Sequence, residues 1–220
     1  MERELNYVNE YGNISHVNLL KNAVKMLEKF DFKLARDRMK GTTKVEAYYD
    51  DPDLSIIKKG NVLRSMKNAE HDNATFFFFY KQYFNKPDKP YDLYKESRSE
   101  ASESFAAFLH NLGLGIAVEK DPVLNADIKR RSVVLENESA RLVIACEHVE
   151  YYKTVKLDMW ENLIEIADLS MQDEELFCRV NEVLLKELPI RLIKQTKPQR
   201  GLEKYNKIKN MSNLLKPSSS

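Results

Sequence analysis

Apolar and polar residues alternate along many short stretches of this chain, which is the pattern of strands with one buried face. On residues 1–11, Glu2, Glu4 and Asn6 share one face, and the residues between them share the other. The run 74–84 (ATFFFFYKQYF) is dense in residues that favour strands. The same pattern predicts further strands over residues 32–39, 42–49, 54–57, 62–67, 93–100, 123–134, 140–149 and 163–166.

Three segments carry helical spacing instead. Ser15 can cap a helix whose apolar positions recur every three or four residues and which is expected to end near Phe30. Residues 105–112 form a second such segment, which stops at Gly113, a residue type that commonly ends helices. Residues 173–188 form a third, amphipathic segment. Strands with a few helices between them indicate the α+β class.

The segment 47–67 predicts two turns and then places a cation on a strand. Residues 50–52 (DDP) favour the first turn, because Asp bonds its own backbone and Pro fixes φ. Gly60 supplies a positive φ in the second turn. Alternation then puts Arg64 on the face opposite to Leu63. A cation on an otherwise buried strand requires an anion near it.

A sheet of about eight or more strands tends to curl or close on itself. We therefore expect one large antiparallel sheet that curls or closes, with a few helices between its strands. No internal repeat or linker divides the chain. One domain is expected over residues 1–208, followed by a flexible tail over residues 209–220.

Composition narrows the classes of function. The chain carries 35 basic and 34 acidic residues, which argues against a partner such as double-stranded nucleic acid or a membrane surface. Cys146 and Cys178 are too few for a disulfide framework and lack the spacing of zinc ligands, so both are expected to be structural thiols. No apolar run approaches the ~18 residues of a membrane span, so a cytoplasmic protein is expected. Six glycines assemble neither a Walker nor a Rossmann phosphate loop.

Charged residues recur at strand positions that could share one interior. They are Arg64, Lys81, Arg98, Glu100, Lys129, Arg131, Glu147 and Glu165. Lys and Arg are natural partners of a triphosphate, Arg through bidentate contacts. Carboxylates repel phosphate but can hold Mg²⁺ or Mn²⁺, which bridges to phosphate oxygens. The pattern favours a site for polyanions, although a single such charge on a strand usually faces solvent.

In their order, these residues resemble the CYTH family, also called the triphosphate tunnel metalloenzymes. The resemblance spans nearly the whole chain. It rests on the segments 2–6 (ERELN), 48–64 (YYDDPDLSIIKKGNVLR) and 196–201 (TKPQRG), and on Lys81, Arg98 with Glu100, Lys129 with Arg131, Glu147 and Glu165. The family includes class IV adenylyl cyclases, thiamine triphosphatases, inorganic tripolyphosphatases and fungal-type RNA triphosphatases.

The resemblance implies a closed antiparallel β-barrel, a tunnel of about eight strands with flanking helices. It also implies a role for each matching residue. Phosphate binding is implied for Lys58, Arg64, Lys81, Arg98, Lys129, Arg131, Lys197 and Arg200. Metal binding is implied for Glu4, Glu100, Glu147 and Glu165, and a catalytic role for Glu2, Glu4 and Lys197. The chain departs from the family pattern in three places, because Asn6 replaces a Lys, Met66 a basic residue and Ala167 an acid.

The leading hypothesis is a divalent-metal-dependent hydrolase that uses Mg²⁺ or Mn²⁺. Its substrate would contain a triphosphate: inorganic tripolyphosphate, a nucleoside triphosphate or thiamine triphosphate. The three departures motivate an alternative hypothesis, a non-catalytic polyphosphate or nucleotide sensor. A class IV adenylyl cyclase is a further alternative. RNA with a 5′-triphosphate as a partner, and assembly as a homodimer, stay open.

Overall fold

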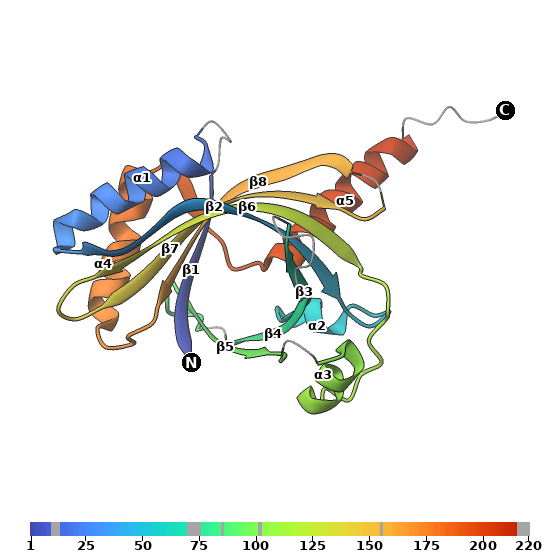
Figure 1. Cartoon of the computed structure of the whole chain (residues 1–220). Coiled ribbons are helices and arrows are strands. Elements are labelled where there is room, and N and C mark those ends of the chain that lie inside the picture. The colour runs from blue at the N-terminus through green and yellow to red at the C-terminus, as the bar shows by residue number, and fades with distance from the viewer. Residues whose placement is uncertain (10–13, 70–75, 85, 101–102, 155, 215–220) are drawn as a thin grey trace.

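The computed structural model describes residues 1–9, 14–69, 76–84, 86–100, 103–154 and 156–214 (Figure 1). The strands are β1 (Glu2–Asn9), β2 (Lys33–Tyr49), β3 (Val62–Asn68), β4 (Phe77–Phe84), β5 (Asp92–Arg98), β6 (Leu124–Glu136), β7 (Arg141–Tyr152), β8 (Lys156–Asp168) and β9 (Ile190–Leu192). The helices are α1 (His16–Leu27), the short 3₁₀ helix η1 (Glu28–Phe30), α2 (Ser55–Lys58), α3 (Phe105–Leu112), α4 (Glu174–Glu187) and α5 (Lys197–Leu214).

Eight strands close into an antiparallel barrel. Their order is β5-β4-β3-β2-β6-β7-β8-β1, and β1 closes the ring by pairing with β5. In that closing pair Glu2 lies opposite Tyr94, and Glu4 lies opposite Asp92. The short strand β9 pairs with the other end of β1. The predicted barrel and its α+β class are therefore confirmed.

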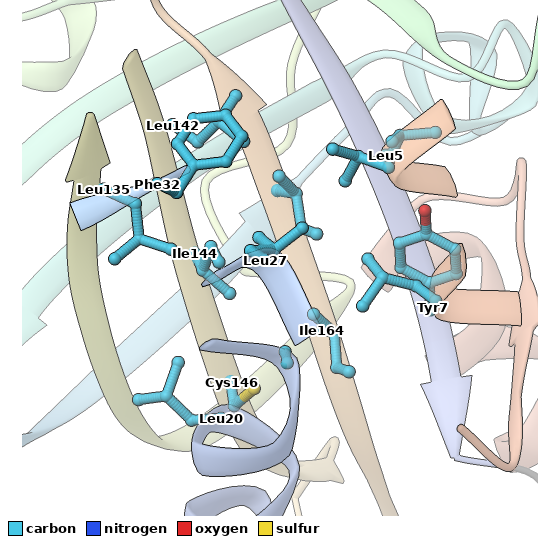
Figure 2. Packing of buried hydrophobic residues seen from close by; sticks show 14 of the residues in the cluster. Leu5, Tyr7, Leu20, Leu27, Phe32, Leu135, Leu142, Ile144, Cys146 and Ile164 are labelled. Carbon is cyan, nitrogen blue, oxygen red and sulfur yellow. The ribbon is translucent and has the colours of Figure 1, made fainter. Parts of the chain in front are cut away.

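The main hydrophobic core lies outside the barrel wall, where α1 and α4 cover the sheet (Figure 1). Leu5 and Tyr7 of β1 point into this core together with Ile144, Cys146 and Ile164 (Figure 2). Because side chains alternate along a strand, the acidic and amide residues of β1 point the other way, into the barrel. One strand thus serves both the core and the interior.

Helix α5 packs against the inner faces of β6 and β7. Leu202 of α5 belongs to a second core cluster with Leu124 and Tyr151, which lie on those strands. A Cβ atom placed on Gly201 would lie 2.5 Å from Leu124 Cδ2 and 2.7 Å from Tyr151 Cδ1. The helix can approach the wall this closely because residue 201 has no side chain.

Several predicted elements hold, and one is wrong. Ser15 caps α1 by accepting a hydrogen bond from the Asn18 amide, and Gly113 ends α3 with a φ of 60°. Residues 54–57 were predicted as a strand, but residues 55–57 belong to helix α2 and Leu54 directly precedes it. The Asp50 carboxylate accepts hydrogen bonds from the amides of Ile56 and Ile57, at 3.0 and 2.8 Å, and so stabilises the helical turn.

The C-terminal region is more regular than the sequence pattern indicates. Residues 209–214 of the predicted tail belong to α5, and residues 215–220 lie outside the described part of the chain.

The two cysteines differ in burial: Cys146 is fully buried, whereas Cys178 is only partly buried. Among the helices that the structure describes, none combines the length and the apolar character needed to cross a membrane.

Candidate functional site

The barrel encloses a cavity of about 290 Å³. Its wall is formed by inward-facing side chains of β1–β6 and β8 and by the segment that leads into α5. The basic residues that line it are Lys44, Arg64, Lys81, Arg98, Arg130, Lys194, Lys197 and Arg200, and the acidic ones are Glu46, Asp92, Glu96 and Glu165. Three more carboxylates, on Glu4, Glu147 and Glu161, lie behind this wall and pair with its cations. The ion pairs therefore decide which cations remain available to a ligand.

One ion-pair network joins β2, β3 and β5. Arg64 Nη1 lies 2.9 Å from Glu46 Oε1, and Arg64 Nη2 lies 3.5 Å from Glu96 Oε2. The Tyr48 hydroxyl donates a 2.7 Å hydrogen bond to Glu46 Oε2. Burial alone would raise the pKa of Glu46, but the neighbouring cations, Arg64 first, lower it to about 2. Glu46 is therefore ionised at neutral pH and fixes the Arg64 guanidinium in the cavity wall.

A second network joins β6, β7, β8 and α5. Arg130 Nη1 and Lys197 Nζ each lie 2.5 Å from a carboxylate oxygen of Glu147. The same two cations lie 3.3 and 3.9 Å from oxygens of Glu165. Burial would raise the pKa of Glu147 and of Glu165, but Lys197 and Arg130 hold both below their usual range. Two carboxylates, the buried Glu147 and the partly buried Glu165, thus share two cations.

A third network lies where β1 closes the barrel. The Lys81 ammonium pairs with Glu4, which also accepts hydrogen bonds from Tyr83 Oη at 2.8 Å and Asn6 Nδ2 at 2.7 Å. The Tyr94 hydroxyl donates to Glu2. The Lys81 Nζ atom also lies 3.7 Å from the centroid of the Tyr94 ring. Glu4 is therefore fully occupied by groups of the chain itself.

Two cavity-lining cations lack a carboxylate partner within the described residues, Lys44 and Arg98. Burial, and then the neighbouring Arg130, lower the pKa of Lys44. The Arg98 guanidinium lies 4.1 Å from the centroid of the Phe77 ring and 5.5 Å from that of Phe79. These two groups can accept an anion without first giving up an ion pair.

Most of the predicted site residues meet in this interior. Arg64, Lys81, Arg98, Glu165, Lys197 and Arg200 line the cavity, and Glu2, Glu4 and Glu147 bond to residues that line it. The Arg200 Nε atom lies 3.0 Å from Glu161 Oε1, an acceptor that it shares with the Tyr151 hydroxyl. Arg200 is therefore tied to the wall on the α5 side of the cavity.

Four predicted residues are elsewhere. Lys129 is 63% exposed on the outer face of β6 and faces Glu150 at 4.0 Å, and Arg131 shares that face. The inward residue is the one between them, Arg130, which lies opposite Glu147. The predicted register on β6 was thus wrong by one residue, and a shift of one reverses every side chain of a strand.

The other two misplaced residues lie outside the strands. Lys58 is exposed on α2, because the segment before it is helical rather than extended. Glu100 is exposed and follows β5, which ends at Arg98, so it has no inward strand position. Neither lines the cavity.

Sequence reasoning missed Lys44, Glu46, Arg130 and Lys194. Lys44, Glu46 and Tyr48 alternate on one face of β2. That alternation was visible in the sequence, but nothing showed which face was inward. Lys194 follows β9 and lies 3.1 Å from Asp92 Oδ1. Because Lys194 lies outside the strands, no alternation pattern could have identified it.

The side chains present do not fit a divalent metal ion. The described chain gathers no group of three carboxylate, imidazole or thiolate ligands. Glu147 and Glu165 already share Arg130 and Lys197, and Ala167 offers no oxygen on the next inward position of β8. Glu100 is outside the cavity, and Glu4 is occupied by Lys81. This donor set does not support the predicted use of Mg²⁺ or Mn²⁺.

Comparisons with known proteins find likeness in structure alone. No protein-family model and no curated protein matches the sequence. The PH1819 protein of Pyrococcus horikoshii OT3 is 18% identical over 93% of this chain and 99% of its own, with a TM-score of 0.54. HpAC1 of Hippeastrum, a candidate adenylyl cyclase with a dominant triphosphatase activity, is 14% identical over 90% of this chain and 91% of its own, with a TM-score of 0.50. At such identities the likeness concerns the fold.

Proposed function

We propose that this chain, which has the fold of the triphosphate tunnel proteins, binds a triphosphate-containing small molecule in its barrel and hydrolyses the terminal phosphate. The observation that carries the proposal is the cavity of about 290 Å³ lined by eight basic side chains of the described chain. A triphosphate needs several cations at once, and guanidinium groups bind phosphate through paired donors. The triphosphatase activity attributed to HpAC1, a protein of the same fold, supports this substrate class.

Arg98 is the first group that we assign to the phosphates, because no carboxylate of the described residues neutralises it. Arg64, Arg130 and Lys197 would share their charge between the anion and their glutamates. Such donors are already fixed in place by ion pairs, so they need little reorganisation when negative charge develops on the leaving group. The cavity therefore supplies both binding and stabilisation of charge.

Hydrolysis requires a water molecule aimed at the terminal phosphorus. Water attacks that atom, the bond from phosphorus to the bridging oxygen breaks, and the proton of the water passes to the released phosphate. We assign the orientation of this water to Glu165, the carboxylate that lines the cavity beside Arg130 and Lys197. Because these cations hold the pKa of Glu165 low against the effect of burial, its carboxylate orients water rather than removes a proton.

A second candidate function is a non-catalytic receptor for the same ligands. The observation that favours it is the set of ion pairs on Glu147 and Glu165, which commits both of these carboxylates to Arg130 and Lys197. Asn6, Met66 and Ala167 supply no charge to the interior. A receptor would bind a triphosphate and leave it intact.

One experiment separates these functions. The purified chain is mixed with tripolyphosphate, ATP and thiamine triphosphate, in EDTA, Mg²⁺ or Mn²⁺, and orthophosphate, cyclic AMP and thermal stability are followed together. We expect release of orthophosphate and a raised melting temperature, because a ligand that binds only the folded state stabilises it. Glu165→Gln should keep the thermal shift and lose the release.

Each other result has a distinct meaning. Stabilisation without any orthophosphate would replace the hydrolase with the receptor. Formation of cyclic AMP with loss of pyrophosphate would assign a cyclase. If no ligand produced either stabilisation or turnover, a triphosphate site would be refuted altogether.

A further inference from the structure

Lys44 occupies a position that the motif residues leave unassigned. It lies on the inner face of β2, two residues before Glu46, and both residues line the cavity. Its Cα faces Asn68 of β3 and Ile128 of β6. Arg130 is therefore the diagonal neighbour of Lys44 on β6. Lys44 thus stands in the wall beside the second ion-pair network.

The surroundings of Lys44 are rich in charge but give it no ion pair of its own. Burial, and then Arg130 and Arg64, lower the pKa of Lys44, while Glu46 and Glu147 oppose the shift. Arg64 holds Glu46 at 2.9 Å, and Arg130 holds Glu147 at 2.5 Å. Both carboxylates are therefore committed to other cations. Lys44 is partly buried, and even partial burial of a cation without a partner has a cost, so the folded chain without ligand is destabilised at this point.

The neighbouring inward position of β3 supplies no cation. Met66 lines the cavity opposite Glu46 and diagonal to Lys44. Its thioether carries no charge, whereas Arg64, two residues earlier, does. Around Met66, the ammonium group that β2 and β3 present to the cavity is therefore that of Lys44 on β2.

We propose that Lys44 is a phosphate-binding residue, whose ammonium group contacts an oxygen of the bound triphosphate beside Arg130. The assignment rests on the proposed function, since it names one contact within that site. It explains why a partly buried lysine without a carboxylate partner lines this cavity. It also predicts opposite effects of removing Lys44 in the absence and presence of ligand.

The test uses Lys44→Met, which keeps most of the side-chain volume and removes the charge, and Lys129→Met as the matched control. Lys129 lies on the neighbouring strand but is 63% exposed on the outer face. Affinity for tripolyphosphate is measured by titration calorimetry in EDTA, and melting temperature is measured with and without ligand. We expect Lys44→Met to bind about ten- to a hundredfold more weakly, the usual range for one charged hydrogen bond.

Stability without ligand provides the second readout. Lys44→Met should melt at the same temperature as the unmodified chain or higher, because it removes an unpaired charge that is partly buried. Lys129→Met should change neither property. Lys44→Gln is a second variant that should show the same loss of affinity. Equal affinity of the unmodified chain and both Lys44 variants would overturn the assignment and leave the triphosphate site standing. No binding by the unmodified chain would overturn both.

Discussion

Replacing Gly201 with Ala should loosen the contact between α5 and the barrel. The added Cβ would lie 2.5 Å from Leu124 Cδ2 and 2.7 Å from Tyr151 Cδ1, distances that real Cβ atoms do not show. Either those side chains or the helix must move. The helix also carries Lys197 and Arg200, so the displacement should reach the ion pairs of the cavity.

The size of the effect follows from two opposing contributions. Extra volume in a packed core costs about 1–3 kcal/mol. Ala is favoured over Gly inside a helix by about 1 kcal/mol, which offsets part of that cost. Because two contacts of the added Cβ fall below 3.0 Å, the upper part of the first range applies, about 2–3 kcal/mol, and the net destabilisation should be about 1–2 kcal/mol. For a chain of this size that corresponds to a fall of about 2–8 °C in melting temperature.

The assay is thermal and urea unfolding of the Gly201→Ala variant beside Asn206→Ala. Asn206 is an exposed position of the same helix, where Ala should leave stability unchanged or slightly higher. Should Gly201→Ala prove as stable as the control, the close packing of α5 against β6 and β7 would be refuted. A matching loss in tripolyphosphate affinity would show that α5 also holds the site.

Two further predictions concern buried carboxylates. Asp50→Ala should lower the free energy of unfolding, measured in urea, by about 1–3 kcal/mol, because the amides of Ile56 and Ile57 lose their acceptor. The control Asp53→Ala, at an exposed position, should have little effect. Because the pKa of Glu46 is lowered to about 2 in the folded chain, its ionisation stabilises the fold above about pH 4.5, and this contribution is lost as pH falls toward 2. Unfolding measured between pH 7 and 2 should show that loss, on the order of 3 kcal/mol; an equal acid dependence in Glu46→Gln would contradict it.

The strands were largely predictable, because alternation is a local signal that survives in the folded barrel. Arg64 was placed correctly through the family resemblance, because alternation separates it from Leu63 without showing which face is inward. Arg130 was missed because the run 129–131 is basic throughout, so a local pattern cannot show which member is inward. Only the pairing of Arg130 with Glu147 across two strands decides it.

Helical segments at the edge of the site were harder to foresee. Residues 54–57 contain three β-favouring apolar residues, yet the Asp50 carboxylate binds their amides and holds a helical turn. The start of α5 carries Pro198 and Gly201, a composition typical of a loop. Its helical form nonetheless has a local cause, because the Gln199 side chain accepts a 2.7 Å hydrogen bond from the Thr196 amide, as in a capping box.

The way in which β1 closes the barrel constrains the order of assembly. Residues 2–4 pair with 92–94 on one side, while Arg3 lies opposite Asp168 on the other. During synthesis the first strand must therefore wait for more than 160 residues to emerge before both of its edges are satisfied. Such distant partners slow folding and leave an unpaired edge open to aggregation meanwhile. Production of this protein should accordingly be more sensitive to translation speed and to chaperones than that of a helical bundle of equal length.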